Sequence, residues 1–235
     1  MNPPHTVAQV LADTGPILLD FDGPVCAVFA TVPDHAVADE LRRVLQAAGI
    51  EIPHHVQTAS DPLDVLRFTA TLDTPELVAR VDDQMRAAEL VAVDGATPTP
   101  YAREVIVAAH QAGRPLAIVS NNSTDAIARY LDAHRLTRYL TAIIGRPHAN
   151  PAGMKPNPEP VRHAVQAVHA DPATCVLIGD STTDIQAARA AGTRSIGYAN
   201  KPGKRDRLTN AGADAITEGP EGMAEMATAL LNVGL

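Results

Sequence analysis

Two aspartates, Asp20 and Asp22, stand one residue apart at the end of a short apolar run, with Gly23 directly after them. The run, residues 17 to 19, is typical of a strand that is buried on both faces. If the extended conformation persists, both carboxylates point to the same side of the backbone, and the glycine lets the chain turn away. Carboxylates held this close repel each other, so we expect a cation, a shared proton or a substrate between them.

Polar side chains also follow the later predicted strands. They are Ser120 and Asn121 after the strand at 116–119, Lys155 in the proline-rich loop after the strand at 142–144, and Asp180 and Asp184 after the strand at 176–178. The carboxyl ends of parallel strands share one edge of the sheet, which is where ligands bind. We therefore expect carboxylates, a hydroxyl and an ammonium group to meet at this edge.

This set of groups fits phosphate chemistry. Clustered carboxylate oxygens without histidine or thiolate suit a hard divalent cation, most readily Mg²⁺. A hydroxyl and Lys155 beside a helix N-terminus suit a phosphate, which could approach the carboxylates only with that cation and that lysine present. Asp20, nearer the rigid strand, is the expected nucleophile and would form an aspartyl-phosphate. Asp22 is the expected general acid and base.

The elements that must position these residues alternate between strand and helix. Strands are predicted at 17–19, 116–119, 142–144, 176–178 and 195–198. Helices are predicted at about 5–12, 34–48, 62–70, 75–91, 99–113, 124–134, 159–169, 183–191 and 221–231. Repeated strand and helix units require a parallel sheet with right-handed crossovers.

No strand signal occurs between residues 28 and 93. The sequence therefore predicts an α/β fold with a doubly wound, Rossmann-like parallel-sheet core, formed by residues 1–27 and 94–235. An all-helical cap domain, residues 28–93, is inserted into this core after the first strand.

The polar residues described above resemble the four motifs of the haloacid dehalogenase superfamily, in their order and at their usual separations. The motifs are Asp20 to Gly23, Ser120, Lys155 with Pro156, and Gly179 to Asp184. The resemblance covers essentially the whole chain, including a helical cap inserted after the first motif, as in phosphoglycolate phosphatase-like members. It implies a Mg²⁺-dependent phosphohydrolase.

The resemblance also implies roles for single residues. These are Asp20 as nucleophile, Asp22 as general acid and base, Ser120, Asn121 and Lys155 as phosphate-binding residues, and Asp20, the backbone carbonyl of Asp22, Asp180 and Asp184 as metal ligands. The sequence departs from the family pattern at Pro24, where threonine or valine is usual. Proline has no N–H group and a fixed φ, so we expect a stiffer turn with one backbone donor fewer.

The cap is expected to provide specificity, because the core binds only the phosphate. His54, His55 and Arg67 are the candidates for contact with the leaving group, although a histidine pair in a loop is most often simply solvated. A lid of this size fits a small phosphorylated metabolite better than a protein substrate. The basic run from 201 to 207 contains no aromatic residue and is expected to be a solvated loop.

Other functions remain open with the same residues. A phosphomutase of the same superfamily uses the same core set, and a non-catalytic phosphate-binding or scaffold protein could retain the fold without turnover. A receiver-like signalling domain also combines aspartates, a hydroxyl and a lysine on a parallel sheet. Its phosphorylated aspartate is not expected on the first strand before a large helical insertion.

Composition limits the class of protein. A chain of 235 residues that is 46% hydrophobic can bury a large core and is not disordered. Its net charge of -8 argues against nucleic acid or an anionic membrane as a partner. Two cysteines without a CxxC pairing predict neither a disulfide scaffold nor a zinc cluster. With no membrane-spanning run and no basic signal-peptide region, we expect a cytoplasmic protein. Its expected oligomeric state is a monomer or a homodimer.

Overall fold

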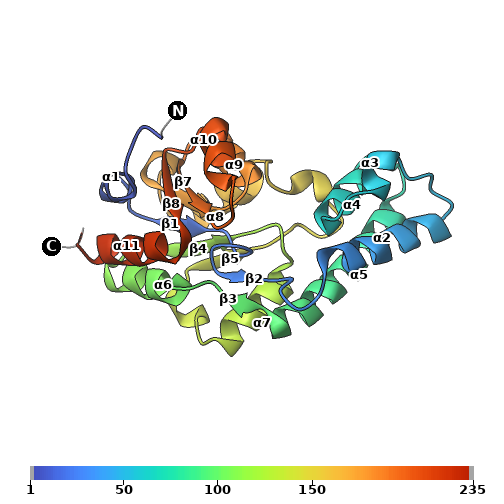
Figure 1. The fold of residues 1–235 in the computed structure, drawn as a ribbon, viewed down its shortest axis with the longest axis horizontal. Helices are drawn as coiled ribbons and strands as arrows, with labels where there is room; N and C mark the ends of the chain where they lie inside the picture. Colours follow the sequence, from blue (N-terminus) through green and yellow to red (C-terminus); the bar gives the residue numbers. More distant parts are fainter. Residues whose placement is uncertain (1–2, 233–235) are drawn as a thin grey trace.

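The centre of the molecule is a six-stranded parallel sheet, seen in a computed structural model that describes residues 3–232 (Figure 1). In order across the sheet, the strands are β5 (Ala142–Ile144), β4 (Leu116–Val119), β1 (Ile17–Leu19), β6 (Val176–Gly179), β7 (Arg194–Ala199) and β8 (Ala215–Glu218). The chain adds β4 and β5 on one side of β1 and the later strands on the other. The strand order therefore reverses at β1, and this reversal is where ligands bind in such sheets.

Helices cover both faces of this sheet. One layer consists of α1 (Val7–Ala12), α6 (Ala102–Gln111), α7 (Thr124–Ala133) and α11 (Gly219–Asn232), and the other of α8 (Glu159–Ala167), α9 (Thr182–Ala191) and α10 (Lys204–Ala211). Leu18 packs with α8 and α9, whereas Ile17 and Leu19 pack in the opposite layer. This alternation follows from the two-residue period of a strand and explains why all of β1 is apolar.

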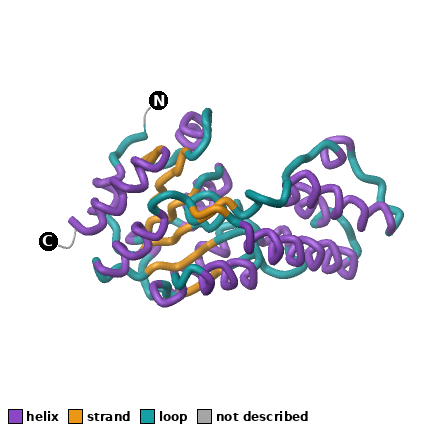
Figure 2. The backbone as a smooth tube through the Cα atoms, turned by 60° about the horizontal axis from the view of Figure 1, so that its bottom comes forward, coloured by secondary structure: helices purple, strands orange, loops and turns teal. Residues whose placement is uncertain are grey.

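Four helices of the insertion form a second lobe at one end of the molecule (Figures 1 and 2). They are α2 (Asp34–Ala47), α3 (His54–Gln57), α4 (Pro62–Thr69) and α5 (Pro75–Ala92). Their apolar faces make a core of their own, which includes Leu41, Leu66 and Met85. Met154, from the loop before α8, is buried in the same core. The cap is thus a helical unit that also packs on a segment of the sheet domain.

A small antiparallel ribbon joins the two ends of this insertion. Strand β2 (Cys26–Ala27) pairs with β3 (Thr97–Pro98). Thr99 extends the connection, because its backbone N–H donates to the Val25 carbonyl at 3.0 Å and its hydroxyl to the Gly23 carbonyl at 2.6 Å. The chain therefore leaves and re-enters the sheet domain at a single place.

The five predicted strands and the nine predicted helices are all present, with shifts of a few residues at their ends. The short 3₁₀ helices are η1 (Val93–Gly95), η2 (Thr137–Tyr139), η3 (Pro151–Gly153) and η4 (Pro172–Thr174). The prediction of a loop at 201–207 is wrong, because residues 204–207 form the first turn of α10. Strand β8 was not predicted. The short helix α3 replaces the loop expected at His54 and His55.

These elements gave weak sequence signals. Helix α10 buries only Leu208, and its N-cap residue Gly203 has no side chain to cap it.

The predicted ends of the core domain, residues 1 and 235, lie outside the described residues. None of the helices between residues 3 and 232 is both long and apolar enough to cross a bilayer.

We predict that Leu18→Ala lowers the free energy of unfolding by about 2–5 kcal/mol, because it leaves a cavity beside the central strand. Thermal and urea unfolding followed by circular dichroism measure this loss. Val91→Ala is the control, since Val91 is 67% exposed and its change should stay within about 0.5 kcal/mol. Equal stability of the two variants would contradict the assignment of Leu18 to the core.

Candidate functional site

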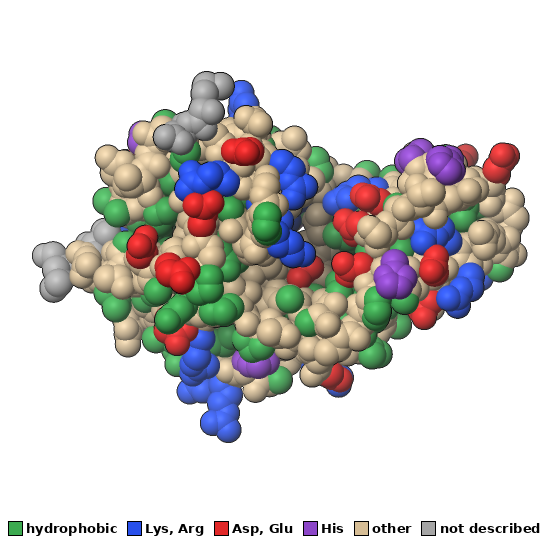
Figure 3. All heavy atoms as spheres, in the orientation of Figure 1, with side chains coloured by type: hydrophobic (Ala, Val, Ile, Leu, Met, Phe, Trp, Pro, Cys, Tyr) green, Lys and Arg blue, Asp and Glu red, His purple; other side chains and the backbone are tan. Residues whose placement is uncertain are grey.

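A cavity of about 190 Å³ lies at the carboxyl ends of β1, β4 and β6, beneath the cap. It is lined by Asp20, Asp22, Asp61, Leu63, Arg67, Ser120, Asn121, Asn122, Lys155, Asp180, Ser181, Thr183 and Asp184. In Figure 3, acidic and basic side chains gather around a recess between the two lobes. The core residues selected from the sequence are therefore brought together, although they come from four separate segments.

Lys155 is buried at the centre of this set, with 1% of its surface exposed. Its Nζ lies 2.9 Å from Asp20 Oδ1 and 2.6 Å from Asp184 Oδ1, and it donates to the Val119 carbonyl at 2.7 Å. Burial disfavours its charge, but the carboxylates of Asp184 and Asp20 outweigh burial and hold the pKa of Lys155 above its ordinary value. The charged ammonium form of Lys155 is thus favoured next to Asp20.

The side chain of Asn121 fixes the backbone of Lys155. Its Oδ1 accepts from the Lys155 N–H at 2.9 Å, and its Nδ2 donates to the Lys155 carbonyl at 3.2 Å. The second N–H of the Asn121 amide is not used in these two bonds, so the side chain keeps a donor for the phosphate role that the sequence predicts. The Ser120 hydroxyl lines the cavity and donates to Asn122 Oδ1 at 3.0 Å.

Asp22 lies at the side of the cavity that faces the cap connection. Its Oδ1 accepts from the Val28 N–H at 2.9 Å. Burial raises the pKa of Asp22 to about 6, with a further rise from the Asp180 carboxylate, while the Val28 hydrogen bond opposes the shift. A carboxyl group with such a pKa can both donate and accept a proton near neutral pH.

Gly23 allows a close approach between the first and last segments of the site. Its φ is +108°, and a Cβ atom there would lie 2.3 Å from Asp180 Oδ2. Any larger residue would therefore push Asp180 away, in addition to straining the backbone. The turn after it is held by the Gly23 N–H, which donates to the Cys26 carbonyl at 2.7 Å. Pro24 is accommodated in this turn.

Asp20, Asp180 and Asp184 could hold a metal ion. Each offers a carboxylate oxygen, and these oxygens lie within 4.8 Å of one another. Asp184 is oriented by Ser181, whose N–H and hydroxyl donate to Asp184 Oδ2 at 2.9 and 2.7 Å. Burial, reinforced by neighbouring carboxylates, raises the pKa values of Asp20 and Asp180. An oxygen-only set of mutually repelling carboxylates fits a hard divalent cation.

Two residues that sequence reasoning missed contact Asp180. Asn200 Nδ2 donates to Asp180 Oδ2 at 2.9 Å, and the Lys204 ammonium group pairs with the same oxygen. Lys204 belongs to the run that was predicted to be a solvated loop. The sequence carried no sign of this contact, because it depends on how the chain turns back from β7 into α10.

The cap contributes Asp61, Leu63 and Arg67 to the cavity. Leu63 and Arg67 lie one turn apart on α4, and Asp61 caps that helix by accepting from the Leu63 N–H at 2.8 Å. Of the three cap residues selected from the sequence, Arg67 lines the cavity and His54 and His55 do not. His55 instead borders a separate hollow on the cap.

Comparison with known proteins gives a family and a fold. A family model for haloacid dehalogenase-like hydrolases matches residues 17–192. A phosphoglycolate phosphatase from Salmonella paratyphi A is 33% identical over 107 residues, which are 46% of this chain and 42% of the relative. The chain thus spans about two fifths of the length of the curated relatives it matches.

Solved structures match over nearly the whole chain. A haloacid dehalogenase family hydrolase from Deinococcus radiodurans, with bound phosphate and sodium, is 25% identical with a TM-score of 0.62, covering 95% of this chain and 97% of that one. A β-phosphoglucomutase from Clostridium difficile is 16% identical with a TM-score of 0.65, covering 92% and 97%. The second likeness concerns the fold alone.

We predict that Lys204→Met tightens the binding of Mg²⁺ to the protein by about tenfold, because it removes a cation that competes for Asp180. Isothermal titration with MgCl₂, without substrate, measures this affinity. Arg207→Met makes the same change of charge at an exposed position of α10 and should leave the affinity within about twofold. Weaker binding by the Lys204 variant would show that the ammonium group supports the cation site.

Proposed function

Because the chain belongs to the haloacid dehalogenase-like hydrolase family, we propose that it is a Mg²⁺-dependent phosphatase that hydrolyses a small phosphorylated metabolite. The observation that carries the proposal is the meeting of Asp20, Lys155 and Asp180 in one cavity. A carboxylate nucleophile, a fixed ammonium group and an oxygen-only cation site are the parts that phosphoryl transfer through an aspartate requires. Similarity to phosphoglycolate phosphatases supports a phosphate ester as the substrate.

The proposed reaction has two displacements at phosphorus. A carboxylate oxygen of Asp20 attacks phosphorus, the bond from phosphorus to the leaving oxygen breaks, and Asp22 gives its proton to that oxygen. Asp22 then takes a proton from a water molecule, whose oxygen attacks the phosphorus of the aspartyl-phosphate. The bond between phosphorus and Asp20 breaks, and inorganic phosphate leaves. Both aspartates are then back in their starting protonation states.

The remaining core residues hold the phosphoryl group. Lys155, Ser120 and Asn121 are proposed to bind its oxygens. The proposed cation ligands are Asp20, the backbone carbonyl of Asp22, Asp180 and Asp184. When bound, Mg²⁺ would supply the positive charge that lets a phosphate dianion remain among these carboxylates.

The size of the cavity supports a small substrate. Its volume of about 190 Å³ is below the roughly 300–1,000 Å³ of pockets for drug-sized ligands. Arg67 of the cap faces the same space as the core residues, and we propose that it binds the part of the substrate beyond the phosphate. The cap would thus select the leaving group, while the core performs the transfer.

We predict that Asp20→Asn lowers the rate of p-nitrophenyl phosphate hydrolysis by about 10³-fold or more, because an amide does not attack phosphorus. The release of p-nitrophenolate is followed by absorbance. The parent should lose activity with EDTA and regain it with MgCl₂. Asp206→Asn, the same change at an exposed position, should retain the parental rate.

Two outcomes would decide against the proposal. If no metal-dependent turnover occurred, with Asp20→Asn matching the parent, the chain would be a non-catalytic member of its family. If sugar phosphates were converted into isomers without release of inorganic phosphate, the chain would be a phosphomutase.

We predict that Arg67→Ala raises the KM for p-nitrophenyl phosphate or for a small phosphorylated metabolite by about tenfold, because a charged hydrogen-bond donor is lost from the cavity. Steady-state kinetics measure the change. His55→Ala is the matched cap variant and should leave KM within about twofold, since His55 lies outside the cavity. Equal effects of the two variants would argue against a specific role for Arg67.

A further inference from the structure

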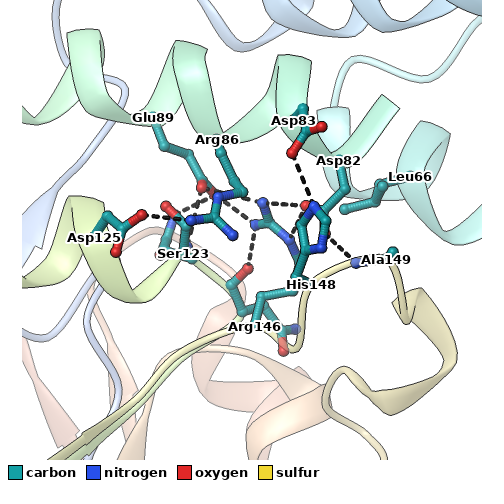
Figure 4. A network of polar contacts seen from close by, with 12 residues as sticks. Leu66, Asp82, Asp83, Arg86, Glu89, Ser123, Asp125, Arg146, His148 and Ala149 are labelled. Atoms are coloured by element: carbon teal, nitrogen blue, oxygen red, sulfur yellow. Dashed lines mark hydrogen bonds and ion pairs between the residues drawn. The ribbon is translucent and has the colours of Figure 1, made fainter. Parts of the chain in front are cut away.

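Arg146, in the loop after β5, is buried together with two carboxylates of the cap helix α5 (Figure 4). Its Nε donates to Asp82 Oδ1 at 2.8 Å, and its Nη1 donates to Glu89 Oε1 at 2.7 Å. The three side chains are at most 2% exposed. Asp82 and Glu89 lie seven residues apart, which is about two helical turns, so both occupy the face of α5 that meets the sheet domain.

Glu89 also binds the loop that follows β4. Its Oε2 accepts from the Ser123 N–H at 3.0 Å, and its Oε1 accepts from Asn122 Nδ2 at 3.3 Å. Ser123 occupies the N-cap position of α7, but its own side chain makes no capping bond. The carboxylate of Glu89 therefore accepts from the N-cap N–H, as an N3 side chain does in a capping box, and complements the positive end of the α7 dipole.

Arg146 holds the same loop from its other side. Its Nη1 donates to the Asn121 carbonyl at 2.7 Å. The Asn121 amide in turn fixes the backbone of Lys155. A series of direct contacts therefore connects Glu89, through Arg146 and Asn121, to Lys155. Met154, next to Lys155 in the chain, is buried in the core of the cap. The segments that carry Ser120 and Lys155 thus both contact the cap, directly or through Arg146.

We propose that Glu89 is a positioning residue, through which the cap helix α5 holds the phosphate-binding loop 120–123 and, through Asn121, the backbone of Lys155. The inference rests on the proposed function, because it assigns to Glu89 a part in binding the phosphoryl group of the substrate. Glu89 does not line the cavity and acts through the residues that do. On this basis the cap completes the phosphate site in addition to covering it.

A second ion pair in the same region provides a matched control. Arg86 of α5 pairs with Asp125 of α7, and both are labelled in Figure 4. This pair also links the cap helix to α7, but the two side chains are 33% and 58% exposed. Its loss removes a link between the two lobes without removing a contact to the loop 120–123.

The test compares Glu89→Gln with Asp125→Asn. Glu89→Gln keeps the shape of the side chain and removes the charge opposite Arg146. We expect its dissociation constant for inorganic phosphate, measured by calorimetry with MgCl₂ present, to rise about tenfold or more. The KM for p-nitrophenyl phosphate should rise in parallel, while kcat stays within about threefold. Asp125→Asn should match the parent in both measurements.

Stability is measured on the same samples, by thermal unfolding, so that binding is compared only where the variants are folded. If Glu89→Gln does not fold, Glu89→Asp keeps the charge but shortens the side chain, and it should weaken phosphate binding in the same direction. Folded Glu89 variants with parental phosphate affinity would overturn the proposal. So would equal losses in the Glu89 and Asp125 variants, which would indicate a general effect of loosening the cap.

The two proposals can fail separately. A parent protein that binds phosphate but hydrolyses no phosphate ester would refute the proposed function, while weaker phosphate binding by the Glu89 variants would still support the positioning role. A parent that hydrolyses p-nitrophenyl phosphate, with Glu89 variants of parental affinity and KM, would refute the positioning role alone.

Discussion

The buried ammonium group of Lys155 determines how the site is built. A charge at this depth is tolerated only when it is paired and hydrogen-bonded. Asp20 after β1, Asp184 at the start of α9 and the Val119 carbonyl at the end of β4 provide these partners. Asn121 fixes the backbone that carries the lysine. The charge of Lys155 therefore connects the loop before α8 to the ends of three neighbouring strands, β1, β4 and β6.

The topology of the sheet explains why sequence reasoning could locate the core of the site. A residue that directly follows a buried parallel strand is placed at one edge of the sheet by the strand order alone. Asp20, Ser120 and Asp180 follow such strands, and all three line the same cavity. The helical insertion could be identified because no strand signal occurs between residues 28 and 93 and its apolar positions have a helical period.

The contacts that sequence reasoning missed depend on tertiary structure without a local pattern. Lys204 reaches Asp180 from a helix that buries a single side chain. Glu89 and Arg146 are 57 positions apart, and a charged residue on a helix is usually solvated. The spacing of Asp82 and Glu89 on one face of α5 was the available sign, but it does not reveal the arginine between them. Such pairs become visible only when the segments are placed in space.

The ribbon of β2 and β3 has a consequence for how this chain could be re-engineered. Since the insertion begins and ends at paired strands, its length adds little to the entropy lost when the sheet domain folds. A foreign lobe could therefore be joined to the sheet domain at this ribbon with little entropic cost. Yet a graft that replaced all of α5 would remove both carboxylates that pair with Arg146 and leave it as an uncompensated buried cation. A chimera should therefore join the foreign lobe to α5 at a position before Asp82, so that Asp82 and Glu89 are kept.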